Sequence, residues 1–169
     1  MDRIWRSRRD SDQGFSLVEL LIVIIIMGIL AAVAIPMFLS QREKAQDGAT
    51  RSDVETLGKE LVTWFVDHNS GDVPQITVTD GAYLMGATGA TLNVATDKVG
   101  NVSRNVTGRG TGGAITLTDA DGAATAVSGS NWCVGLTNPQ GRIHDFFYSS
   151  THGLQEGSCT GPTATPSAT

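Results

Sequence analysis

The chain has 169 residues, of which 12 are Lys or Arg and 17 are Asp or Glu, giving a formal net charge of −5. This length predicts one folded domain in addition to any membrane segment. The acidic excess argues against bulk electrostatic binding of nucleic acid, which depends on Lys and Arg side chains that neutralise phosphates.

The first 14 residues form a polar, basic leader. It contains four Arg residues and three Asp residues: Arg3, Arg6, Arg8, Arg9, Asp2, Asp10 and Asp12. Basic residues mark the cytoplasmic side of a membrane segment, so the leader predicts that the C-terminal part of the chain lies outside the cytoplasm. A secretory signal peptide would be cleaved after its apolar run, whereas here a polar, helix-forming segment follows that run. We therefore expect the apolar run to remain in the mature protein.

Residues 15–39 form this apolar run, in which Glu19 is the only charged residue. About 20 apolar residues are enough for a helix to cross a hydrocarbon core about 30 Å thick. A charge held in lipid without a partner costs about 2.5–3.5 kcal/mol, so Glu19 requires a cation that the run itself does not contain. Gly28 and Pro36 disfavour a helix in water but are tolerated in membranes, and they predict soft points where the helix leaves lipid.

The motif GFSLVE at residues 14–19 resembles the prepilin processing site of type IV pilins, and the resemblance covers roughly the first quarter of the chain. It implies that a prepilin peptidase cleaves between Gly14 and Phe15 and then N-methylates Phe15. A free α-amino group has a pKa of about 7.7–8.0 and is mostly protonated at pH 7. Glu19 could pair with this amine, either its own or that of a neighbouring copy, and a pair between copies would set the axial register of two helices. The alternative is an ordinary signal-anchored protein in which Glu19 has no role.

Residues 40–70 predict an amphipathic continuation of the helix. Apolar side chains recur with a period near 3.6 residues at Ala45, Ala49, Val54, Leu57, Leu61, Trp64 and Phe65. Gly48 and Gly58 weaken this helix without ending it, and residues 69–71 (NSG) are typical of a helix end. A helix from Phe15 to His68 would be about 80 Å long. Its second half is expected to pack against the back of a sheet.

Residues 71–159 are expected to form a globular β domain. Strands are expected at residues 76–78, 92–94 and 114–118, with a return strand at 123–127 after a turn at 119–122. The rest of residues 72–113 is expected to be surface loop. The clearest hairpin has strands at 131–137 and 142–149, because the intervening Asn138-Pro139-Gln140-Gly141 suits a type I turn. Aromatic residues concentrate in this hairpin, so we expect it to contact the amphipathic helix. The polar, Pro-punctuated residues 160–169 predict a disordered tail.

Cys133 and Cys159 are the only two cysteines. An even number of cysteines in an exported domain favours one disulfide, which would close a loop of about 27 residues and stabilise the fold by roughly 3–4 kcal/mol. Two free buried thiols are the alternative. A metal site is disfavoured because the pair lacks Cys-x-x-Cys spacing.

No constellation in the sequence predicts catalysis, a metal site or a cofactor. His68, His144 and His152 do not have the spacing of metal ligands, and neighbouring strand residues such as His144 and Asp145 would point to opposite faces. The glycine-rich residues 107–113 lack the Lys-Ser/Thr of a phosphate-binding loop and are expected to form a flexible turn. A calcium loop starting at Asp119 would require Glu at its twelfth position, which is Ser130.

The sequence therefore predicts an α+β fold in which a long N-terminal helix, membrane-spanning in its first half, packs on a small antiparallel sheet. The resemblance to type IV pilins implies a structural protein that polymerises into a helical filament through its apolar helices, for adhesion, motility or DNA uptake. It also implies a prepilin peptidase, an assembly ATPase and a platform protein as partners. A pseudopilin of a type II secretion system or of a competence pilus is the alternative. A membrane-anchored extracytoplasmic binding domain or enzyme is a more distant one.

Overall fold

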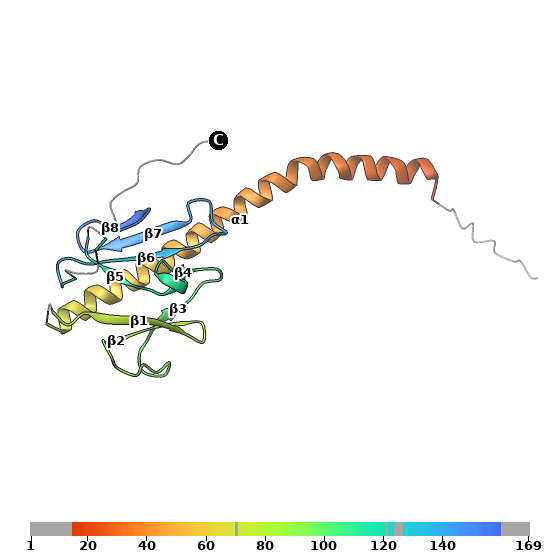
Figure 1. The fold of residues 1–169 in the computed structure, drawn as a ribbon. Coiled ribbons are helices and arrows are strands. Elements are labelled where there is room, and N and C mark those ends of the chain that lie inside the picture. Colours follow the sequence, from red (N-terminus) through yellow and green to blue (C-terminus); the bar gives the residue numbers. More distant parts are fainter. Residues whose placement is uncertain (1–14, 70, 121, 124–126, 160–169) are drawn as a thin grey trace, which may run out of the picture. The chain divides into compact units, whose positions relative to one another are not determined.

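The computed structural model describes residues 15–69, 71–120, 122–123 and 127–159 (Figure 1). The chain divides into two compact units, Met1–Leu39 and Ser40–Thr169, and each is described by itself. The expected leader at 1–14 and the expected tail at 160–169 lie outside the described residues.

Helix α1 (Leu17–Asp67) has 51 residues and contributes to both units. Ser16 begins it, because its hydroxyl accepts a hydrogen bond from the Val18 N–H at 3.3 Å, as an N-cap residue does. Glu19 lies in the first turn, where the helix dipole favours a carboxylate. The single long helix is confirmed, with bounds within two residues of those expected.

The second half of α1 buries a face that is polar at its start and apolar further on. The buried positions follow the 3–4 spacing of a helix: Asp47, Thr50, Asp53, Val54, Leu57, Gly58 and Leu61. The expected apolar face is confirmed at Val54, Leu57 and Leu61 but is wrong at Ala45, which is exposed. Between Ala45 and Val54, the buried helix positions are polar: Asp47, Thr50 and Asp53.

The first sheet is antiparallel and has the order β1 (Pro74–Thr79), β2 (Ala82–Ala87), β3 (Lys98–Asn101). Asp80 and Gly81 join β1 to β2 with φ of 50° and 71°, which is the two-residue turn that matches strand twist. The expectation at 76–78 is confirmed within β1. The strand expected at 92–94 is wrong, because this stretch is a loop. Strands β2 and β3 lie where the sequence predicted surface loop, so that prediction is also wrong.

The second sheet is also antiparallel, with the order β4 (Thr107–Gly108), β6 (Cys133–Thr137), β7 (Asp145–Ser149), β8 (Gly153–Glu156), and β5 (Leu117–Thr118) also pairs with β6. The β6–β7 hairpin is confirmed, and its turn closes with the Gly141 N–H donating to the Asn138 carbonyl at 3.1 Å. The strand expected at 114–118 is confirmed for its last two residues. The return strand expected at 123–127 includes residues 124–126, which lie outside the described residues. Residues 107–113 were expected to be a flexible turn but contribute β4 and the 3-10 helix η1 (Thr111–Gly113).

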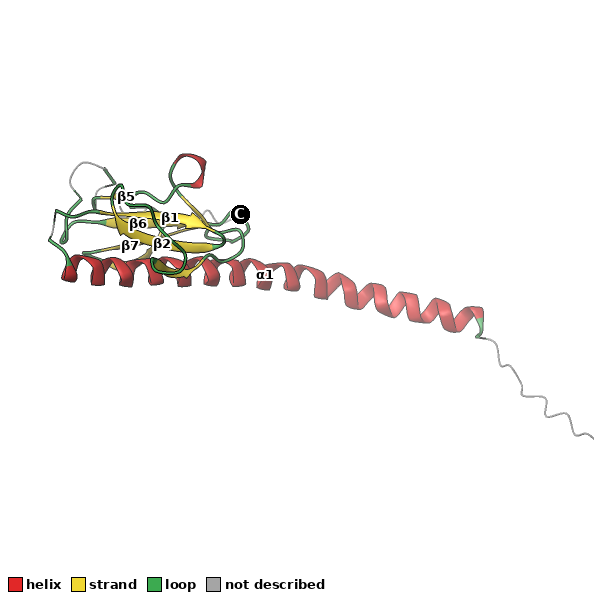
Figure 2. Cartoon of the chain, turned by 90° about the horizontal axis from the view of Figure 1, so that it is seen from below, coloured by secondary structure: helices red, strands yellow, loops and turns green. Residues whose placement is uncertain are grey.

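Both sheets lie along one side of the second half of α1 (Figure 2). The core between them contains buried apolar side chains from the helix and from both sheets, among them Leu57, Leu61, Tyr83 and Leu136. Trp132 is 1% exposed and stacks on Tyr148 with ring centroids 5.8 Å apart. Tyr148 in turn lies against Gly58, where an added Cβ would come within 2.3 Å of the ring. The α+β architecture expected from the sequence is therefore present.

Candidate assembly surface and its anchoring domain

The first unit presents an apolar helix surface that nothing in the described chain covers. Every residue from 15 to 39 is exposed, and the large apolar side chains range from 43% exposed at Val23 to 80% at Leu17. By length and composition alone, α1 could cross a membrane, with a mean hydropathy of 3.0 in its most apolar window. Soluble monomers rarely expose continuous apolar patches larger than a few hundred Å². This surface therefore requires lipid or other chains to cover it.

Glu19 is exposed within this surface and, in the described part of the chain, forms no ion pair. The spacing Ser16-x-x-Glu19 could mark a capping box, in which Glu19 would accept the Ser16 backbone N–H. Only the Ser16 hydroxyl makes a capping bond among the described residues, so the Glu19 carboxylate is not used to begin the helix. Phe15 is 77% exposed and precedes the helix, while Gly14 lies outside the described residues. The helix continues through Gly28 and Pro36.

Asp53 fixes the first sheet to the helix. Its carboxylate is 6% exposed and accepts the Tyr83 hydroxyl at 2.8 Å, the Ser103 N–H at 2.8 Å and the Ser103 hydroxyl at 2.7 Å. Burial, followed by the hydrogen bond to Asp53, raises the pKa of Tyr83 far above its usual range, so this hydroxyl remains a donor. One helix residue therefore holds strand β2 and the connection after β3.

Asp47 fixes the second sheet in a similar way. It is 8% exposed, and its two carboxylate oxygens accept the Ile143 N–H at 3.1 and 3.2 Å. Asn138, which is fully buried, donates from its side chain to the Gln46 side chain at 3.0 Å. A Cβ at Gly141 would come within 2.1 Å of the Asp47 carboxylate, so the glycine permits this close approach. The β6–β7 turn is thus bound to the helix by polar contacts.

Sequence reasoning missed both anchors. Asp47, Thr50, Val54, Leu57 and Leu61 follow the 3–4 spacing of one helix face, and extending the apolar face upstream by this rule would have included Asp47 and Thr50. The signal was available, but a carboxylate is ordinarily assigned to the solvent side.

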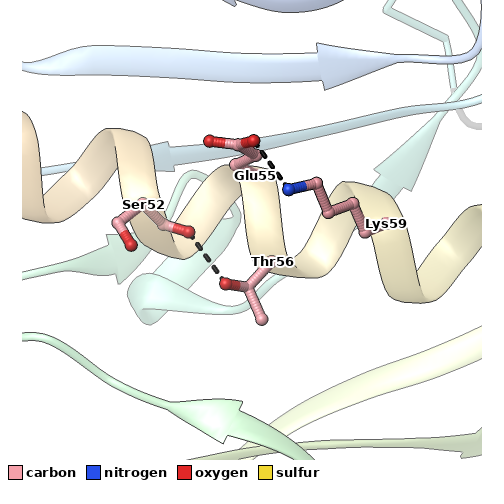
Figure 3. A network of polar contacts seen from close by, with 4 residues as sticks. All are labelled: Ser52, Glu55, Thr56 and Lys59. Atoms are coloured by element: carbon pink, nitrogen blue, oxygen red, sulfur yellow. Dashed lines mark hydrogen bonds and ion pairs between the residues drawn. The ribbon is translucent and has the colours of Figure 1, made fainter.

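The solvent side of the same helix segment carries ordinary surface chemistry (Figure 3). Lys59 lies 2.8 Å from Glu55, one helical turn away, and the Thr56 hydroxyl donates to the Ser52 carbonyl at 2.9 Å. The hydrogen bond and charge of Lys59 lower the pKa of Glu55, and Glu55 raises the pKa of Lys59 in return. Exposed pairs of this kind contribute little to stability.

The histidines do not converge, and no group of three or more His, Cys, Asp or Glu residues that could hold a metal ion occurs among the described residues. His68 stacks on Trp64 at 3.8 Å, and His152 lies in the turn before β8. His144 was expected on a strand beside Asp145, which is wrong. It lies in the turn with φ of 69°, while Asp145 begins β7 and forms an ion pair with Arg109 at 2.6 Å.

Cys133 and Cys159 form the disulfide that the sequence predicts. Cys133 is the first residue of β6 and is fully buried, whereas Cys159 follows β8. The disulfide therefore ties the chain after the last strand back to the middle of the second sheet.

Comparisons with known proteins agree with these features. The family model described as the prokaryotic N-terminal methylation motif matches residues 9–35. A fimbrial protein of Pseudomonas aeruginosa is 32% identical over 132 residues, which are 72% of this chain and 81% of that protein. The type IV major fimbrial protein FimA of Dichelobacter nodosus is 36% identical over 84 residues, which are 50% of this chain and 54% of that protein.

A second group of relatives has shorter matches. The type II secretion system core protein G of Klebsiella michiganensis is 37% identical over 62 residues, which are 37% of this chain and 44% of that protein. The chain thus spans less than half the length of this relative. No solved structure matches the chain significantly.

Proposed function

Since the chain belongs to the type IV pilin family of fimbrial proteins, we propose that it is the structural subunit of an extracellular helical filament. The observation that carries this proposal is the exposed apolar segment at 15–39, with Glu19 as its only charge. Membrane lipid covers this surface in the stored subunit and neighbouring copies cover it in the filament. Assembly then transfers the apolar surface between two dry environments, so it never meets water.

Before assembly, the subunit crosses the cytoplasmic membrane once, with the basic leader inside and the β domain at 71–159 outside. A prepilin peptidase cleaves between Gly14 and Phe15 and N-methylates the new terminus. The exposure of Phe15, which precedes the helix, supports an accessible processing site. The protein then becomes part of a surface filament through a platform protein in the membrane and a cytoplasmic assembly ATPase. Gly28 and Pro36 serve as soft points when the helix leaves lipid.

Glu19 sets the register of assembly by accepting the protonated amine of Phe15 on the adjacent subunit. The absence of an ion pair at Glu19 within the described chain supports a partner from another copy. Buried pairs of this kind specify register more than they add stability, because desolvation offsets much of the Coulomb attraction.

The Glu19→Ala variant, expressed as the only copy, tests this function. Removing the carboxylate makes the helix more apolar, so insertion into the membrane fraction and cleavage at Phe15 are expected to persist. Filaments in the sheared surface fraction are expected to fall to the level of cells that lack the assembly ATPase. Glu43→Ala, an exposed acidic residue beyond the apolar segment, is the matched control and retains filaments. Normal filament yield from Glu19→Ala would refute the pairing.

The secretion-system relatives support a second candidate, a pseudopilin of a type II secretion system. Electron microscopy of cells expressing the protein at its natural level separates the two functions. Long surface fibres that bind an antibody against the β domain support the pilin. Secretion defects without fibres in a deletion strain support the pseudopilin. A mature protein that retains its leader in a strain containing the peptidase, and that never forms an assembly, would contradict both.

A further inference from the structure

The connection between β6 and β7, residues 138–144, is held rigidly by buried polar groups. The Asn138 side chain donates to Gln46, and the Ile143 N–H donates to both oxygens of Asp47. The Asn138 N–H also donates to the His144 carbonyl at 2.8 Å, although His144 has a left-handed φ of 69°. Such a conformation is uncommon for a residue with a side chain and persists where surrounding contacts determine it. Except for the Asn138 side chain, these bonds use the backbone of the turn and not the side chains of Arg142, Ile143 and His144.

The turn displays a basic and an apolar side chain side by side. Arg142 and His144 are exposed, and Ile143 is 40% exposed although its N–H is bound to a buried carboxylate. Among the described residues, Arg142 forms no ion pair. The packing of the β domain therefore accounts for the path of this turn but not for the side chains at its tip.

The helix residues that the turn contacts are close in the sequence to the end of the apolar segment. The turn is bonded to residues 46 and 47 of α1, which follow Leu39 by seven and eight residues. Arg42 and Lys44 follow Leu39 by three and five residues. With residues 15–39 in lipid, these two are the first basic residues after the lipid-covered segment.

The exposed charges on the turn and on the helix residues just after the apolar segment are mostly basic. Arg42, Lys44 and Arg142 accompany one exposed acidic residue, Glu43, since Asp47 is buried by the turn. From residue 40 onward, the sequence has 8 Lys or Arg residues against 13 Asp or Glu residues. Basic side chains beside a membrane segment are attracted to anionic lipids, and each shifts the equilibrium by about fivefold.

We propose that the β6–β7 turn, together with Arg42 and Lys44, is a docking surface for the headgroups of anionic phospholipids. It holds the β domain against the bilayer before assembly, and it rests on the proposed membrane storage of the subunit. The Arg142 guanidinium binds lipid phosphate through paired N–H donors, and Ile143 lies beside it against the headgroup layer. The rigid backbone reduces the conformational entropy lost on docking.

The test uses the full-length chain with Ile143→Trp, reconstituted into vesicles that contain brominated lipid as a fluorescence quencher. Ile143 is exposed and only its backbone is bonded, so this change should be tolerated. Val66→Trp is the matched control, because Val66 is 77% exposed and lies in the last turn of α1, 27 residues after Leu39. The unaltered chain supplies the background of its three native tryptophans, Trp5, Trp64 and Trp132.

In phosphatidylglycerol vesicles, the Ile143→Trp signal is expected to be quenched more than the Val66→Trp signal. Adding Arg142→Gln is expected to lower the docked-to-undocked ratio about fivefold. Phosphatidylcholine vesicles or high salt should reduce the quenching as well. These three results together support headgroup docking.

Two results would overturn the proposal while leaving the proposed function intact, provided that the chain floats with the vesicles. One is equal quenching of Ile143→Trp and Val66→Trp in phosphatidylglycerol vesicles. The other is a signal that rises with the protein-to-lipid ratio but not with phosphatidylglycerol content, which would assign the turn to contacts between copies. A chain that does not float with vesicles would contradict membrane storage itself, and the docking surface with it.

Discussion

Replacing Asp53 with Ala is expected to destabilise the β domain by about 3–5 kcal/mol. Its carboxylate accepts three hydrogen bonds of 2.7–2.8 Å from Tyr83 and Ser103 while only 6% exposed. Hydrogen bonds to a charged group contribute about 1.5–3 kcal/mol each. The expected loss of stability is smaller than the sum of three such hydrogen bonds, because Ser103 is only half-buried and water can replace part of the hydrogen bonding that Ser103 loses. Tyr83→Phe removes one of the three bonds and should cost about 1.5–3 kcal/mol.

The measurement is urea unfolding of the full-length chain in detergent, followed by the near-ultraviolet circular dichroism of the buried Trp132. A change in the midpoint at constant slope reports stability alone. Asp67→Ala, an exposed acidic residue on the same helix, is the control and should change stability by less than about 0.5 kcal/mol. The double variant of Asp53 and Tyr83 should cost less than the sum of the single variants, because they share one bond. A cost below about 1 kcal/mol for Asp53→Ala would refute the anchoring argument.

In the same assay, Gly58→Ala should lower the free energy of unfolding by about 1–3 kcal/mol, because the added Cβ would overlap the Tyr148 ring. Gly48→Ala, with open space around it, should raise the free energy of unfolding by about 0.5–1 kcal/mol. Equal effects of the two changes would contradict the packing of Gly58 against Tyr148. Cys159→Ser should lower stability by about 3–4 kcal/mol, and native protein with two alkylatable thiols would contradict the disulfide. Gly14→Val should block cleavage because the added side chain hinders approach to the backbone, and N-terminal sequencing that finds normal processing would exclude this requirement.

The long helix could be predicted from the sequence because its periodic pattern is local. The polar anchors could not, since whether Asp53 is buried depends on Tyr83, 30 residues away, and Asp47 depends on Ile143, 96 residues away. The residues that neighbour an Asp in the sequence do not show whether a backbone N–H from another part of the chain will bind its carboxylate. The anchors therefore depend on tertiary structure that a periodic pattern does not contain.

The strand errors have a similar cause. The stretch at 92–94 has strand-like side chains, but the Asn93 side chain accepts the Ala95 N–H and Asp97 accepts the Asn93 N–H. Such local bonds compete with pairing to a strand. Strand β2 was missed because four consecutive residues are buried, so it lacks the alternation of a half-exposed strand. The Asp80-Gly81 pair before it was the usable signal, since Asp-Gly favours the hairpin turn found there.

The change from a lipid-compatible to a domain-forming helix takes place within eight residues. Leu39 ends the apolar segment, charged residues begin at Arg42, and Asp47 is already buried by the β6–β7 turn. If residues 15–39 lie in lipid as proposed, moving the helix deeper would bring Arg42 and Lys44 into hydrocarbon. Moving it outward would expose apolar side chains to water. Under that proposal, the insertion depth is limited in both directions by this short stretch, before any contact with another subunit forms.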